Sequence, residues 1–176
     1  MTGMARFGVF LGLMAIAVLA AAAFGALHNQ VSYTVGPDYF HAFKFRQFTI
    51  PREMAPRLGA MEVGILASWW MGVLMGLPPL VLGLFTLRPT GRYWRAGLRA
   101  IALAVGVTVL TALAGLLFGL VVVTPETAAQ VALPVETQDP VGFLRAGVMH
   151  DASYLGGVLG MLAAVWLIWR SGRTGR

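Results

Sequence analysis

The sequence predicts an all-α integral membrane protein, a four-helix bundle with a short interfacial helix after the first span. Two observations carry this prediction. Hydrophobic residues make up 58% of the 176 residues and charged residues only 11%, whereas a soluble domain carries about 25% charged residues. The apolar residues also gather in four runs, each near the roughly 20 residues needed to cross a bilayer. We expect one transmembrane domain over residues 1–176.

The four predicted spans cover about residues 8–27, 58–87, 98–123 and 143–169. The first run follows Arg6 and is rich in small residues, as in a cleaved signal peptide, but it is longer than a usual signal sequence, so we expect it to be retained. Each run carries two glycines four residues apart, which lets helix backbones approach closely. These pairs are Gly8/Gly12, Gly72/Gly76, Gly115/Gly119 and Gly156/Gly160.

Basic residues beside the spans predict the orientation. The connection between the second and third spans holds four arginines and no acid, while the next connection carries Glu126, Glu136 and Asp139. By the positive-inside rule both termini are cytoplasmic, and the first and third connections lie outside. An aromatic belt is then expected at the inner interface, formed by Tyr93, Trp94, Trp166 and Trp169.

Composition and motifs exclude several classes of protein. The chain has no cysteine, which rules out disulfides, iron–sulfur clusters, thiolate zinc sites and covalent c-type haem. The net charge of +6 lies beside the spans, where it suits lipid headgroups, so we expect no nucleic-acid partner. No phosphate-binding loop, dinucleotide fingerprint or GxSxG motif occurs. Few polar residues lie mid-span, which disfavours a transporter or a channel.

The first outer connection, residues 28–57, is unusually aromatic. Its start, HNQVSYTV, alternates in a strand-like way before Gly36 and Pro37 interrupt it. A short amphipathic helix is predicted over residues 37–48, with its aromatic residues at headgroup level and Lys44 and Arg46 reaching lipid phosphates. Such a helix would lie across the outer mouth of the bundle, as a cap, as a lid over a site or as a docking surface for a partner subunit.

The same segment carries a family resemblance. Asn29-Gln30, Tyr33-Thr34, Pro37-Asp38-Tyr39-Phe40 and Lys44-Phe45 make it similar to a segment of uncharacterised bacterial four-span integral membrane proteins. The resemblance implies only the four-helix membrane architecture, and no activity or catalytic residue comes with it. We therefore expect a multi-pass protein of the bacterial cytoplasmic (inner) membrane.

Four ionisable residues near the outer ends of the spans form the candidate site: His28, Glu62, His150 and Asp151. Polar groups at membrane depth are costly and mark candidate functional sites. Two histidines and two carboxylates could ligate a transition metal. Alternatively, His28 and His150 could be the axial ligands of a haem, or the carboxylates could serve a proton relay.

A purely structural interpretation competes with these sites. Glu62 could pair with Arg57, Arg145 or His150 across the bundle, which would satisfy its charge without any chemistry. The prediction that fits best is a non-catalytic accessory or assembly subunit of a membrane complex, in contact with lipid and with partner subunits or a second copy of itself. The alternative is a metal- or haem-binding membrane protein with its site at the outer face. No reaction is predicted.

Overall fold

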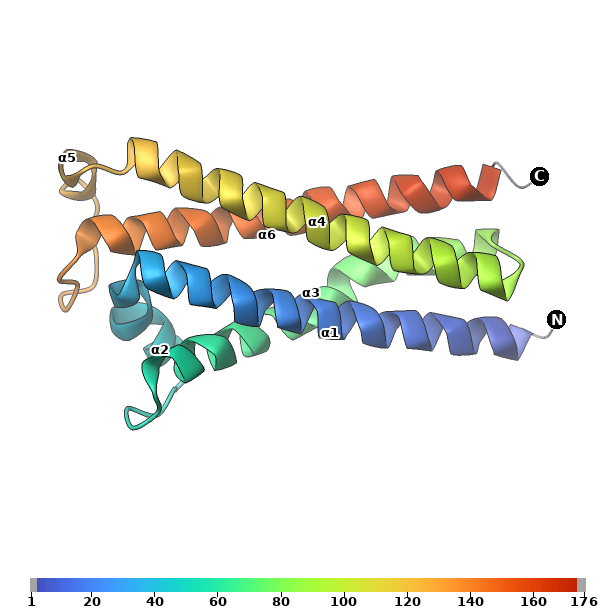
Figure 1. Ribbon diagram of the computed structural model, residues 1–176, viewed down its shortest axis with the longest axis horizontal. Helices are drawn as coiled ribbons and strands as arrows, with labels where there is room; N and C mark the ends of the chain where they lie inside the picture. Colours follow the sequence, from blue (N-terminus) through green and yellow to red (C-terminus); the bar gives the residue numbers. More distant parts are fainter. Residues whose placement is uncertain (1–2, 174–176) are drawn as a thin grey trace.

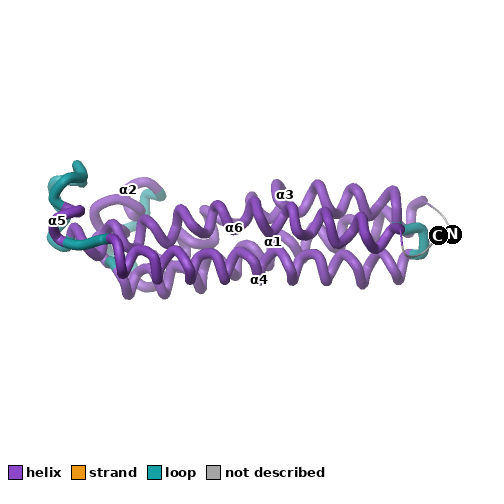
Figure 2. Tube along the Cα trace, turned by 90° about the horizontal axis from the view of Figure 1, so that it is seen from above, coloured by secondary structure: helices purple, strands orange, loops and turns teal. Residues whose placement is uncertain are grey.

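The computed structural model describes residues 3–173, and four long helices dominate it (Figure 1). All four are long and apolar enough to cross a membrane, and the described residues contain no strand (Figure 2), which confirms the predicted fold class. These helices are α1 (Gly3–Val35), α3 (Pro56–Thr86), α4 (Thr90–Val122) and α6 (Pro140–Arg173).

Helices α1 and α6 extend beyond their predicted spans at both ends, whereas α3 and α4 begin earlier than predicted and end within one residue of the predicted position. The largest difference is in α1, which continues through His28 to Val35. The strand-like interpretation of HNQVSYTV is therefore wrong. In a helix the residues at positions i, i+1 and i+4 lie on one face, and here the inward face includes His28, Asn29 and Ser32.

The bundle consists of two antiparallel helix pairs. Helix α1 packs mainly on α3, and α4 packs mainly on α6. The start of α1 and the end of α6 lie at one end of the bundle, and the short helices α2 and α5 lie at the other (Figure 1). We call these the terminal end and the capped end.

Small residues allow the close contacts within each pair. A side chain at Gly72 would clash with the backbone of Ala17 and Val18, and one at Gly156 would clash with Thr108. In the first span the predicted pair is wrong, because Gly8 faces open space. The close contact of α1 with α3 is made instead by Gly25, which lies directly against Gly64.

The terminal end is held by an apolar core. Tyr93 is fully buried there, and its hydroxyl donates a hydrogen bond to the Leu80 carbonyl at 2.8 Å. The ring fits because it lies against Gly83, which has no side chain to exclude it. The prediction that Tyr93 belongs to an interfacial belt is therefore wrong. The core comprises Leu13, Leu80, Leu87, Tyr93, Ala96, Ala100, Ala164 and Ile168.

At the capped end the chain folds into the mouth of the bundle. A π-helical turn, η1 (Tyr39–Lys44), leads into α2 (Phe45–Gln47), and α5 (Pro125–Ala128) lies in the connection before α6. Phe40 is fully buried in a second apolar cluster that includes residues of α3 and α6. The segment predicted as a short helix across the outer mouth of the bundle, residues 37–48, is helical over residues 37–47, and its aromatic side chains pack into the mouth instead of facing the headgroups.

Candidate functional site at the capped end

Buried polar side chains concentrate at the capped end. Continuation of α1 past its apolar run brings a polar face into the interior, opposite the start of α6. In the described part of the chain, every buried polar or charged residue belongs to this region: His28, Asn29, Ser32, Lys44, His150 and Ser153.

Two histidines from different helices are in direct contact. The rings of His28 and His150 meet edge to face, with centroids 4.6 Å apart and an interplanar angle of 88°. The Nε2 atom of His150 lies 3.1 Å from the Ser32 hydroxyl oxygen, within hydrogen-bonding distance. The Nε2 atom of His28 is buried and has no hydrogen-bond partner among the described residues. Such an orphaned atom is uncommon in native structures and marks a place to look for a ligand.

Aromatic rings enclose this histidine pair. Tyr39 stacks on His150 with centroids 4.9 Å apart, and Phe24 lies 5.2 Å from His28 on the side of the membrane interior. The Phe143 ring meets the Tyr39 ring edge to face, with centroids 5.2 Å apart. The pair is therefore shielded from bulk water by side chains of α1, η1 and α6.

Lys44 extends inward rather than toward the lipid headgroups that we had expected it to contact. Its ammonium group donates to the Gln47 side-chain oxygen at 3.0 Å and lies 4.6 Å from the centre of the Phe43 ring. Burial lowers the pKa of Lys44, and the nearby Asp151 carboxylate opposes that shift. Burial likewise raises the pKa of the Tyr39 hydroxyl, with smaller contributions from Tyr154 and Asp151.

Polar side chains also tie the end of α1 to the start of α3. The Asn29 side-chain amide donates to the Ala60 carbonyl at 2.9 Å, and the Gln30 amide donates to the Arg57 carbonyl at 3.0 Å. The Arg57 guanidinium returns a hydrogen bond to the Thr34 hydroxyl at 3.2 Å. Asn29, Gln30 and Thr34 therefore have a structural role that the sequence did not reveal.

A second set of contacts joins the aromatic segment, residues 37–48, to the connection before α6. One carboxylate oxygen of Asp38 accepts hydrogen bonds from the backbone N–H groups of Gln138 and Asp139, at 2.5 and 2.6 Å. Arg46 forms a bidentate pair with Glu136, with N–O distances of 2.9 and 3.2 Å. The Arg46 guanidinium holds the pKa of the Glu136 carboxyl below its usual range. Arg46 thus bonds within the chain, whereas we had expected it to reach lipid phosphates.

Of the four predicted site residues, two are in contact and two lie apart from them. His28 and His150 come together, and Asp151 is exposed on α6 yet near enough to influence Lys44 and Tyr39. Glu62 is half-buried on α3, and no hydrogen bond or ion pair joins it to another side chain within residues 3–173.

The expected partners of Glu62 bond elsewhere. Arg145, for example, donates to the carbonyls of Val123 and Leu120 at the end of α4, at 3.0 and 3.4 Å. Within the described residues, no three histidine, aspartate or glutamate side chains lie close enough together to hold a metal ion. The edge-to-face contact of His28 with His150 also leaves no space for an iron atom between the two rings, so haem binding through both would require α1 and α6 to separate.

Comparison of the chain with protein-family models, with curated proteins and with solved structures finds no match.

Proposed function

We propose that this chain is a non-catalytic accessory or assembly subunit of a membrane complex. The observation that carries the proposal is that polar side chains at the capped end form hydrogen bonds within the protein. Asn29, Gln30 and Ser32 bond to groups on neighbouring helices, and Asp38 and Arg46 bond to the connection before α6. A catalytic site instead needs reactive groups that a substrate can reach.

The proposed location is the bacterial cytoplasmic membrane, with both termini in the cytoplasm and the capped end outside. Arg88 lies in the connection between α3 and α4 at the terminal end, and Arg92, Arg95 and Arg99 follow it in the first turns of α4. Arg170 and Arg173 lie at the same end, on α6, and their guanidinium groups lie over Trp166 and Trp169, with distances of 5.3 and 4.8 Å to the ring centres. Arginine beside interfacial tryptophan is typical of the cytoplasmic side of a membrane protein.

The capped end offers a preformed surface for a partner protein. In the connection before α6, Val135 is 99% exposed and Val131 is 47% exposed. The connection is held in place by Asp38 and by the Arg46–Glu136 pair. Exposed apolar side chains on an anchored loop suit contact with a protein, because little further ordering is needed on binding.

Site-specific photocrosslinking in native membranes tests this proposal. A photoreactive amino acid at Val135 should form an adduct with a protein of defined mass. The matched control position is Val121 on α4, which is 78% exposed on an apolar span and should crosslink to lipid alone. A chain that forms no protein adduct at Val135 and migrates alone on native gels would contradict the proposal.

A second candidate function is binding of a transition metal by His28 and His150. The observation that favours it is the orphaned, buried Nε2 atom of His28 beside the second imidazole. The carboxylates of Glu62 and Asp151 are the further predicted ligands. Elemental analysis of purified protein tests this candidate, with a Soret band as the signature of haem.

Histidine variants provide the control for that measurement. Bound metal should be lost in His28→Ala and retained in His41→Ala, because His41 is exposed and lies 2.9 Å from the Tyr33 hydroxyl. Wild-type protein that purifies without stoichiometric metal would exclude this candidate and leave the accessory role.

A further inference from the structure

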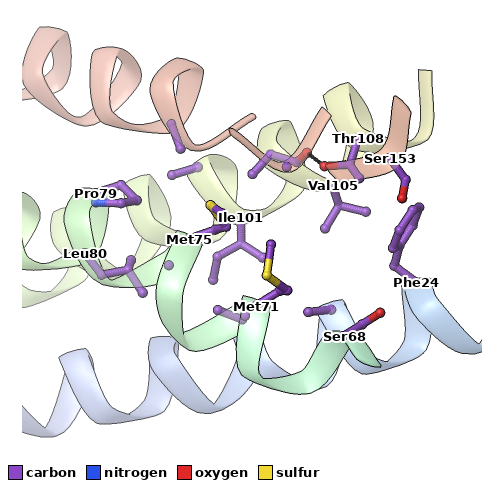
Figure 3. Close-up of a pocket in the computed structure, with 18 of the residues that line it drawn as sticks. Phe24, Ser68, Met71, Met75, Pro79, Leu80, Ile101, Val105, Thr108 and Ser153 are labelled. Carbon is purple, nitrogen blue, oxygen red and sulfur yellow. Dashed lines mark hydrogen bonds between the residues drawn. The ribbon is translucent and has the colours of Figure 1, made fainter. Parts of the chain in front are cut away.

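A cavity lies between the two helix pairs near the middle of the bundle (Figure 3). Its volume is about 110 Å³, it is partly open, and all four long helices contribute to its lining. Figure 3 shows Met71 and Met75 of α3 and Ile101 of α4 extending into the space among the helices. The proposed function does not account for this cavity.

The packing of the bundle explains why a cavity forms here. Glycines at the contacts allow α1 to approach α3 closely and α4 to approach α6 closely. Where the two pairs face each other, many lining residues are small, including Ala21, Ala104 and Gly157. A Cβ atom at Gly157 would meet nothing within 4 Å. The gap between the pairs is thus left by side chains too short to fill it.

The lining of the cavity is mostly apolar. The Thr108 hydroxyl already donates to the Ala104 carbonyl at 2.8 Å, and the Ser153 hydroxyl donates to the His150 carbonyl at 2.7 Å. Ser68 and Tyr154 are the other polar lining residues, and the remainder are apolar side chains and glycines, whereas a buried water needs two to four polar partners. An apolar cavity of roughly 150 Å³ in a soluble protein stays dry and binds benzene. A space of this size therefore suits a short stretch of hydrocarbon.

We propose that this cavity binds a hydrocarbon chain from the bilayer, either a phospholipid acyl chain or an isoprenoid chain. The cavity lies midway along spans α1 and α3, at the depth where the surrounding solvent is itself hydrocarbon. Met71 and Met75 are flexible and polarizable, so they can adapt to a chain of variable shape. Filling the gap restores the dispersion contacts that the lining residues lack.

Photolabelling of the full chain in vesicles of phosphatidylethanolamine and phosphatidylglycerol tests the proposal. One probe is a phospholipid with a diazirine at the middle of an acyl chain, and the other is an isoprenoid alcohol with a diazirine in its chain. Mass spectrometry should find label on Met71, Met75 or Ile101, and the probe that labels them identifies the source of the chain. Label confined to outward residues such as Leu110 and Phe118 with both probes would overturn the proposal.

Two matched glycine variants sharpen the test. Gly157→Leu places a side chain in the cavity, and Gly106→Leu places one in open space outside it. Cavity labelling should be lost in the first and unchanged in the second. Unchanged labelling in Gly157→Leu would contradict the proposal. Competition by excess unlabelled lipid in the wild-type protein should also remove the cavity label, and this measurement requires no variant to fold.

Discussion

The two ends of the bundle differ in the interactions that hold their helices together. At the capped end, polar side chains bond across helices, as Asn29 does to α3 and Ser32 to His150 on α6. At the terminal end, a cluster of leucine, alanine and isoleucine surrounds Tyr93, whose hydroxyl bonds to a backbone carbonyl. Both ends thus contain an apolar cluster, and the capped end adds several buried side-chain hydrogen bonds between helices.

The difference matters because of the solvent. Apolar side chains gain little by leaving lipid for a helix interface, so the terminal end depends on close fit. A polar side chain that loses its partner inside the bundle has no water to replace it. The capped end should accordingly be the more sensitive to single substitutions, and it fixes which faces of the helices meet.

The largest expected effect comes from separating α1 and α3 near the capped end. Gly25→Leu would force a side chain into the Gly64 backbone, while Gly8→Leu on the same helix meets open space. We expect Gly25→Leu to destabilise the protein by about 3 kcal/mol, the upper part of the usual range for overpacking. Thermal unfolding in detergent micelles should show a large loss for Gly25→Leu and none for Gly8→Leu. Equal stability of the two variants would show that the close contact is unimportant.

A smaller effect compares one hydrogen bond from each end. Ser32→Ala leaves the buried Nε2 atom of His150 without its partner, which should cost about 1–3 kcal/mol. Tyr93→Phe removes a bond to a carbonyl that lies within a helix, and it should cost about 0.5–1.5 kcal/mol. Unfolding midpoints of the two variants give the comparison. A greater loss of stability in Tyr93→Phe than in Ser32→Ala would show that the terminal end is the more sensitive to substitution.

The charge on Lys44 should make part of the stability depend on pH. Burial lowers its pKa in the folded state below the ordinary value of 10.5, so the unfolded chain binds more protons in that interval. The contribution of Lys44 to stability should therefore rise as pH increases toward 10.5.

The titratable neighbours of Lys44 are Tyr39, Asp151 and His150, and Tyr39 has the opposite effect because burial raises its pKa. The difference in stability between wild type and Lys44→Met isolates the lysine. Parallel pH profiles for the two proteins would contradict a buried, charged amine.

The smallest effect is expected for the exposed Arg46–Glu136 pair. Because the folded-state pKa of Glu136 is lowered, the pair stabilises the connection at neutral pH, and this contribution is lost as pH falls below about 4.5. Hydrogen exchange in residues 129–139 should accelerate in Arg46→Gln at pH 7, with little change in the unfolding midpoint. Identical exchange in wild type and variant would show that the pair does not order the connection.

Hydropathy predicted the four helices because a bilayer demands long apolar runs. Hydropathy marks only the point at which the sequence becomes polar, however, and not the end of the helix: α1 continues for two further turns. Those turns contain His28 and Ser32, four residues apart on one helical face, and that spacing was the signal that could have been used. The depth of His28 and His150 placed them correctly at one end. The inward folding of Tyr39 and Lys44 depends on contacts with α6 that no local pattern encodes.

A double-mutant cycle between Ser32 and His150 tests most directly whether the polar groups of the capped end are structural links. The variants are Ser32→Ala, His150→Phe and the double variant, each assayed by reversible unfolding in micelles. Because the two side chains are buried and in contact, we expect a coupling free energy of about 1 kcal/mol or more, with the double variant less destabilised than the sum of the singles. Strictly additive losses would contradict the account.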